Sequence, residues 1–261
     1  DRVERKPSAI PKKSTERDSK LHPDRADYVE VMPDLMPPRG KLYDYSSVYA
    51  DSLDDGQRYG VDLALTVLDK KDRRGFLLAD GTGFGKTRQL LAIADQYKKS
   101  TGEKVLIITE NKLIIENAFE KDAASMGIDM RQFKIGTYTG FKAKGGGLKP
   151  EFDQDWGMVL FDEGHNLKNY DTVQAAAARK LKKKKVVYAT ATPMDKPSAG
   201  AYMWSDVMGK DYLTTLDKLG MKLVNGDKTW DKVNKKYVTT KVPQLKEGTS
   251  PKQLMANIQS M

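Results

Sequence analysis

The sequence predicts an α/β domain with a mostly parallel central sheet and helices on both of its faces. Five short strand-like runs alternate along the chain with longer amphipathic stretches; four are apolar at consecutive positions, and the third, at 133–138, has a weaker pattern. A strand that is apolar on both faces is typical of a parallel sheet covered on each side. Right-handed crossovers then place helices on both faces. The five runs are residues 76–79, 105–108, 133–138, 158–161 and 186–189.

The predicted helices lie between these runs. Apolar residues recur at helical spacing over 61–68, and this helix is expected to end near 73–75. A flexible loop is expected at 144–147, where one lysine precedes three glycines. Further helices are predicted over residues 86–98, 113–126 and 175–184.

Composition shifts divide the chain into three parts. Residues 1–41 contain six prolines in a polar stretch, which predicts an extended basic leader or linker. Residues 42–208 hold the α/β pattern. Residues 209–261 are a lysine-rich extension with one expected helix at 212–219 and short β-like pieces at 237–242, and we expect this part to lead to a further lobe.

The composition excludes several classes of function. The 261 residues include no cysteine and two histidines, which excludes disulfides, thiol catalysis and thiolate metal sites and leaves no imidazole cluster for zinc. No apolar run approaches the roughly 18 residues that span a bilayer, so no membrane partner is expected. The net charge of +9 favours polyanion partners. The expected location is the cytoplasm, with the nucleoid or a phage virion as variants.

A glycine-rich turn between the first apolar run and the helix at 86–98 predicts a phosphate-binding loop. Its glycines would let backbone N–H groups converge on phosphate oxygens at a helix N-terminus. Lys86 would reach the β- and γ-phosphates, and the Thr87 hydroxyl would bind Mg²⁺. Asp80 stands where the usual first glycine of this motif lies. The predicted nucleotide-binding residues in the loop are Gly81, Thr82, Gly83, Gly85, Lys86 and Thr87.

Two carboxylates follow the apolar run at 158–161. We assign Asp162 to the metal and Glu163 to the base that orients and deprotonates the attacking water. Two acids after an apolar run usually mark only a solvated strand end. Their occurrence downstream of a phosphate loop favours an ATP·Mg²⁺ site.

The residues at 162–169, Asp-Glu-Gly-His-Asn-Leu-Lys-Asn, resemble the DExH motif II of superfamily 2 helicases, most closely the Swi/Snf-type translocases. Residues 188–193 resemble the motif III of that family, and Asp80 is common at its position there. Residues 79–83 and 201–203 are similar to the strawberry notch branch. The resemblance spans about 57–208 and implies a RecA-like lobe with ATP and Mg²⁺ as cofactors and nucleic acid, with double-stranded DNA favoured, as partner.

The resemblance also implies roles for single residues. Gln57 would read adenine, although an exposed glutamine at a helix start is an equal alternative. Thr190 and Thr192 would couple the ATP state to nucleic-acid contact. The alternative is that these two β-branched residues occur there only because they suit the end of a strand. His165 would form a hydrogen bond toward motif III, or be a structurally satisfied histidine.

Two loops match the positions that grip the sugar-phosphate backbone in this family. Asn111 and Lys112 follow the second run, and Thr139 follows the third; their side chains suit phosphate contact without reading sequence. Glu110 departs from the family pattern and would repel a phosphate. The basic residues at 179–185 are interpreted as a solvated helix end rather than as a nucleic-acid contact.

The family closes ATP between two RecA-like lobes, and the second lobe supplies arginines. Here 261 − 193 = 68 residues follow Pro193, and none after Arg179 is arginine. We therefore expect a second lobe in cis or from a partner chain, and slow or no hydrolysis without it. The competing hypothesis is a non-hydrolysing scaffold component of a larger, possibly phage, assembly. A third hypothesis, a P-loop kinase or GTPase, would require residues that recognise a particular base or bind a phosphate acceptor, and we find none in this sequence.

Overall fold

The computed structural model describes residues 39–81, 83–143, 147–169, 172–192, 201–231, 236–250 and 253. The chain divides into two units, residues 1–41 and 42–261. Of the first unit only the 3₁₀ turn Arg39–Lys41 is described, so the leader stays a prediction, as does the boundary at 208. The loop expected at 144–147 lies outside the described residues except for its last glycine.

The second unit is built on a five-stranded, all-parallel sheet, which confirms the predicted fold class. The strand order is β1-β5-β4-β2-β3, so β1 lies at one edge and pairs with β5 alone. Strands adjacent in the chain are thus not always adjacent in the sheet. The strands are β1 (Gly75–Leu78), β2 (Val105–Thr109), β3 (Lys134–Thr137), β4 (Asp155–Asp162) and β5 (Lys182–Ala189).

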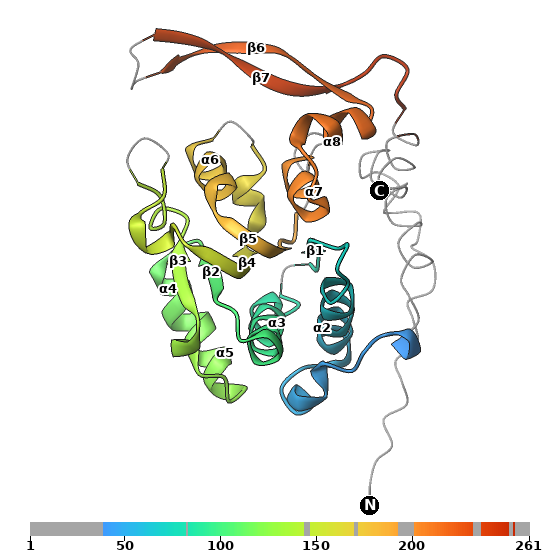
Figure 1. Ribbon diagram of the computed structural model, residues 1–261, viewed down its shortest axis with the longest axis vertical. Helices are drawn as coiled ribbons and strands as arrows, with labels where there is room; N and C mark the ends of the chain where they lie inside the picture. The colour runs from blue at the N-terminus through green and yellow to red at the C-terminus, as the bar shows by residue number, and fades with distance from the viewer. Residues whose placement is uncertain are drawn as a thin grey trace, which may run out of the picture. The chain divides into compact units, whose positions relative to one another are not determined.

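Helices cover both faces of the sheet (Figure 1). Helices α2, α3, α4 and α5 lie on one side, and α6, α7 and α8 on the other. The segment predicted as one helix over 113–126 is interrupted by a π-helical stretch, Ile115–Phe119, between α4 and α5. The helices are α2 (Asp55–Leu68), α3 (Lys86–Thr101), α4 (Lys112–Ile114), α5 (Glu120–Ser125), α6 (Val173–Lys180), α7 (Ala201–Met208) and α8 (Tyr212–Lys218).

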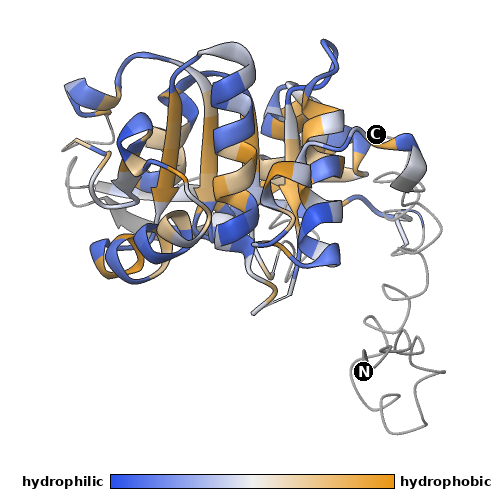
Figure 2. Ribbon diagram, turned by 90° about the horizontal axis from the view of Figure 1, so that it is seen from below, coloured by the Kyte–Doolittle hydropathy of each residue, from blue (hydrophilic) through white to orange (hydrophobic). Residues whose placement is uncertain are grey.

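The sheet separates two apolar cores, because successive side chains of a strand point to opposite faces. In β4, Leu160 packs with the α2 and α3 side, whereas Val159 and Phe161 pack with the α6 and α7 side. Each fully buried side chain of this size contributes about 1.5–3 kcal/mol to folding. Figure 2 shows the result: apolar strands lie between helices whose outer faces are hydrophilic.

Local signals fix the two helices that flank the site. Helix α2 begins with a capping box, in which the Asp54 side chain accepts from the Gln57 N–H and the Gln57 side chain accepts from the Asp54 N–H. Helix α3 ends at Gly102, whose φ of 71° needs a residue without a Cβ.

The four lysines at 182–185, called the lysine run below, are not the end of a helix, which corrects the interpretation made from the sequence. Helix α6 stops at Lys180, and residues 182–185 open strand β5, where Lys182 pairs with Asp155 of β4 and Lys183 with Trp156. The local charge pattern favoured a solvated helix end, but pairing with β4 decides the backbone. Lys183 is buried, and its Nζ lies 3.0 Å from a carboxylate oxygen of Asp206.

A two-stranded antiparallel hairpin follows α8 and is longer than the short pieces expected from the sequence. It consists of β6 (Met221–Asp231) and β7 (Lys236–Leu245). Its base is anchored in the core on the α7 side, where Met221 is buried and Leu223 and Leu245 are partly buried. Among the described residues, no helix combines the length and apolar content that crossing a membrane requires.

Candidate nucleotide site at the carboxyl ends of the strands

The predicted phosphate loop connects the carboxyl end of β1 to the first turn of α3. Gly83 and Gly85 have φ values of 85° and 69°, in the region that L side chains rarely adopt. A Cβ on Gly85 would also lie 2.3 Å from the Gln57 Nε2. The loop leads into a 16-residue helix whose N-terminal N–H groups and dipole favour an anion. Thr82 lies outside the described residues.

Lys86 directs its ammonium group back into the loop. Its side chain is largely buried, and Nζ donates to the backbone carbonyls of Asp80 at 3.2 Å and Gly81 at 3.1 Å. Thr87 follows it in the first turn of α3 and is half-buried. The placement of Lys86 and Thr87 therefore fits the roles predicted for them, and these roles stay predictions.

Two glutamines hold the loop from the helices on either side of it. The Gln89 side chain is fully buried, and its Nε2 donates to the Asp80 carboxylate at 2.6 Å and to the Phe84 carbonyl at 3.4 Å. Gln57 Nε2 donates to the same Phe84 carbonyl at 3.3 Å. Gln57 thus braces the loop, and its reading of adenine stays a prediction. The sequence analysis missed Gln89; its one signal is that it lies one turn after Lys86.

Asp162 ends β4 as a buried carboxylate, with 6% of its surface exposed. Burial raises its pKa from about 3.9 to about 6, although the Thr109 hydroxyl, which donates to Oδ2 at 2.8 Å, and the positive charge of Lys86 both lower it. The negative charge of Glu163 adds to the increase. A buried carboxylate that carries this penalty is well placed to gain from a cation. The sequence analysis did not identify Thr109 as a partner.

Replacement of Asp162 is expected to stabilise the protein while removing a predicted metal ligand. Because the folded pKa is higher than the unfolded one, the carboxylate costs no stability below about pH 4, and the cost grows until about pH 6. Asp162→Asn should therefore raise the free energy of unfolding by about 1–3 kcal/mol at pH 7.5 and by little at pH 4. Urea unfolding at the two pH values measures this.

Asp206→Asn is the matched control for this substitution. Its carboxylate is nearly as buried but is paired with Lys183 and Arg74, so its loss should lower stability at pH 7.5. A lower stability of Asp162→Asn at pH 7.5 would contradict the expectation.

Binding of Mg²⁺ with nucleotide should strengthen in the wild type as the pH rises through about 6.

Glu163 directly follows Asp162 in a left-handed backbone conformation, with φ 49° and ψ 52°. Among the described residues it is the one non-glycine residue with such a φ. This conformation costs about 1–3 kcal/mol and persists only where the surroundings hold it, as commonly happens at functional sites. The Glu163 Oε2 lies 3.1 Å from the His165 Nδ1.

The His165 side chain connects Glu163 with the end of β5. Its Nδ1 is 3.1 Å from the buried Thr190 hydroxyl, the contact that the resemblance implied. Thr190 Oγ1 in turn accepts from the Thr192 N–H at 3.1 Å. The three residues form a chain of contacts from Glu163 to the loop after β5. Their role in coupling stays a prediction.

The residues predicted to contact nucleic acid lie at the same edge of the sheet. Asn111 is the N-cap of α4, where its side chain accepts from the Ile114 N–H at 3.1 Å. Lys112 is exposed beside it, and Thr139 is exposed in the loop after β3. The capping contact gives Asn111 a structural role, whereas Lys112 and Thr139 have side chains open to solvent.

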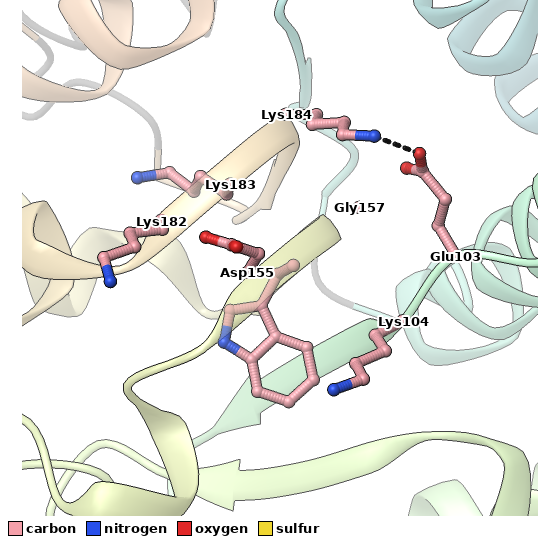
Figure 3. A pocket seen from close by; sticks show the side chains of 8 residues that line it. Glu103, Lys104, Asp155, Gly157, Lys182, Lys183 and Lys184 are labelled. Carbon is pink, nitrogen blue, oxygen red and sulfur yellow. Dashed lines mark hydrogen bonds and ion pairs between the residues drawn. The ribbon is translucent and has the colours of Figure 1, made fainter.

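The lysine run lines a cavity of about 510 Å³ at the opposite edge, where β2, β4 and β5 begin (Figure 3). Its lysines are engaged: Lys184 pairs with Glu103, Lys182 lies 3.6 Å from Asp153, and Lys104 donates to Gln154. The run therefore gives little support to a nucleic-acid contact at this edge.

Comparisons with known proteins agree with this geometry. Residues 48–146 match the family described as P-loop containing NTP hydrolase pore-1, and residues 129–253 match the SNF2-related domain. The human protein strawberry notch homolog 1 is 26% identical over 70% of the chain and 17% of its own length. A bovine SWI/SNF-related regulator of chromatin, subfamily A-like protein 1, is 30% identical over 62% of the chain and 18% of its own.

A bacterial relative and a solved structure extend the comparison. The putative ATP-dependent helicase/translocase YwqA of Bacillus subtilis is 25% identical over 61% of the chain and 19% of its own length. The SWI2/SNF2 ATPase core of Sulfolobus solfataricus, solved in complex with dsDNA, has a TM-score of 0.51 to this chain. The two are 20% identical over 64% of this chain and 38% of that structure's chain, which shows a similarity of fold. The chain spans less than a fifth of the length of the three relatives.

The fold, the loop and these similarities define a P-loop nucleotide-binding lobe. The chain is similar to the first RecA-like lobe of superfamily 2 helicases, with similarity to both the SNF2-related and the strawberry notch proteins.

Proposed function

We propose that this lobe binds ATP·Mg²⁺ and hydrolyses it as part of a nucleic-acid-dependent translocase or helicase. The observation that carries the proposal is the meeting of two segments at one sheet edge, the phosphate loop with Lys86 and the end of β4 with Asp162 and Glu163. The Lys86 ammonium is close enough to the buried Asp162 to lower its pKa, and Glu163 follows Asp162 directly. A phosphate-binding cation, a metal-binding carboxylate and a base then surround one space.

Mg²⁺ suits this donor set, because it prefers hard oxygen ligands and uses one or two carboxylates together with phosphate oxygens. Asp162 and the Thr87 hydroxyl would hold it, and when bound it would neutralise charge on the β- and γ-phosphates. Glu163 would orient the attacking water and take its proton. Lys86 would stabilise the negative charge that develops on the transferred phosphoryl group.

Double-stranded DNA is the favoured track. The relatives include proteins named as a SWI/SNF-related regulator of chromatin and a helicase/translocase, and the fold neighbour was solved with dsDNA. Lys112 is exposed at the start of α4 and Thr139 in the loop after β3, both at the carboxyl edge, where backbone phosphates could be contacted without base readout. Such contacts would weaken steeply with salt.

A second RecA-like lobe, in cis or from a partner chain, would complete the site. A catalytic arginine contributes roughly 10³–10⁵ in rate in such enzymes, and no arginine occurs after Arg179. The alternative of a non-hydrolysing scaffold is not favoured, because Lys86, Thr87, Asp162 and Glu163 are all present and the similarities are to ATPases and translocases.

The test is steady-state ATP hydrolysis by the longest polypeptide that contains this chain, with and without duplex DNA. We expect hydrolysis that rises with duplex DNA and falls again as salt displaces the DNA. Single-stranded DNA and duplex RNA of the same length are the controls for the track. ATP binding with no hydrolysis on any of these nucleic acids would contradict the proposal.

A further inference from the structure

The strained backbone of Glu163 is held by two side chains through its carbonyl oxygen. The Asn166 Nδ2 donates to this oxygen at 3.0 Å, and the Tyr138 hydroxyl lies 3.4 Å from it. The same hydroxyl donates to the Asp162 carbonyl at 2.8 Å. The peptide groups before and after the Glu163 Cα are thus both held by side chains that lie outside β4.

Each of the two side chains is connected to a different loop at the carboxyl edge. Tyr138 directly precedes Thr139 in the loop after β3. The Asn166 amide, which has two N–H groups, also donates to the Glu110 carboxylate at 3.1 Å, and Glu110 directly precedes Asn111. These are the two loops that the sequence predicts will contact the nucleic-acid backbone.

The Tyr138 ring is held rigidly in the core, so its hydroxyl has a fixed position. It is 2% exposed and stacks on Phe161 of β4, with the ring centroids 6.4 Å apart.

We infer that Tyr138 and Asn166 are positioning residues that connect the two nucleic-acid loops to the backbone of Glu163. The inference rests on the proposed function and adds to it a route for nucleic-acid stimulation. The Asn166 backbone N–H also donates to the Glu163 carbonyl at 3.0 Å. We take Glu163 as the element with two states, because its left-handed conformation is strained and the two side chains favour the held state beyond what this backbone bond provides. Nucleic acid that fixes the two loops fixes the donors, and thereby keeps the carboxylate in place for the attacking water.

The experiment compares Tyr138→Phe and Asn166→Ala with the wild type in the longest polypeptide that contains this chain. Turnover is measured at saturating ATP with and without duplex DNA, and ATP affinity is measured separately. Tyr97→Phe is the matched control, because its side chain is also buried but its hydroxyl donates to Glu103 at 2.6 Å, at the opposite edge of the sheet.

We expect Tyr138→Phe to lower DNA-stimulated turnover about two- to tenfold, the range for one lost hydrogen bond, with ATP affinity unchanged. Asn166→Ala should act in the same direction, and Tyr97→Phe should keep the full stimulation. Wild-type stimulation in both Tyr138→Phe and Asn166→Ala would overturn the inference and leave the proposed function intact, and an equal loss in Tyr97→Phe would also overturn it. A wild type that DNA does not stimulate would contradict the proposed function itself, and the inference with it.

Discussion

Glu163→Gln is expected to abolish ATP turnover while leaving ATP binding intact. The amide is nearly isosteric and keeps the side chain near His165, but it cannot accept the proton of the attacking water. Loss of a general base typically costs about 10²- to 10⁴-fold in rate. Steady-state hydrolysis gives the loss in kcat, and titration with ATP should give the same Kd as in the wild type.

The matched control for this substitution is Glu120→Gln, an exposed residue at the start of α5. It removes one carboxylate from the surface and should leave both kcat and Kd unchanged. Glu163→Gln protein that turns over ATP at the wild-type rate would show that the base lies elsewhere. A loss of ATP binding together with turnover would show instead that the substitution disturbs the phosphate loop.

Lys86→Ala is expected to weaken ATP binding. Its ammonium is held at the loop by the two carbonyls of Asp80 and Gly81, and it would exchange these neutral acceptors for charged phosphate oxygens. A hydrogen bond to a charged group contributes about 1.5–3 kcal/mol, so the Kd for ATP should rise roughly 10- to 150-fold. Turnover should fall further, because the same charge serves the transition state.

Lys98→Ala provides the control in the same helix. Lys98 lies in the last turn of α3 and donates to the Gly102 carbonyl, far from the phosphate loop. Its replacement should change stability slightly and ATP affinity not at all. An unchanged Kd in Lys86→Ala would overturn the assignment of the loop, whatever the turnover of that variant.

Much of the fold was predictable because its central strands, β2 and β4, are buried on both faces. A run such as 158–161 is apolar at consecutive positions, and this pattern has few other structural explanations when helices alternate with it. The phosphate loop was predictable for a related reason: glycines with positive φ and a lysine at the start of a helix leave a strong local signal. The observed limits of some helices and strands differ by several residues from the predicted ones.

What the sequence did not reveal depends on distant partners. Lys182–Lys185 have the local character of a surface helix end, and only the pairing with β4 makes them a strand. Gln89 appears as one polar residue within a helix until the fold brings Asp80 to its amide. Tyr138 has no local signal at all, because the carbonyl that its hydroxyl contacts comes from another strand. Contacts of this kind are set by topology rather than by composition.

The sheet order has a consequence for synthesis on the ribosome. Strand β1, which carries the phosphate loop, pairs only with β5, more than a hundred positions later in the chain. Until residues 182–189 have left the exit tunnel, β1 has no neighbour to hydrogen-bond with, and the loop after it has no fixed frame. Such non-local pairing forms late in folding. A nascent chain therefore acquires its nucleotide site after most of the lobe has been made, and products that end before β5 should not compete for ATP.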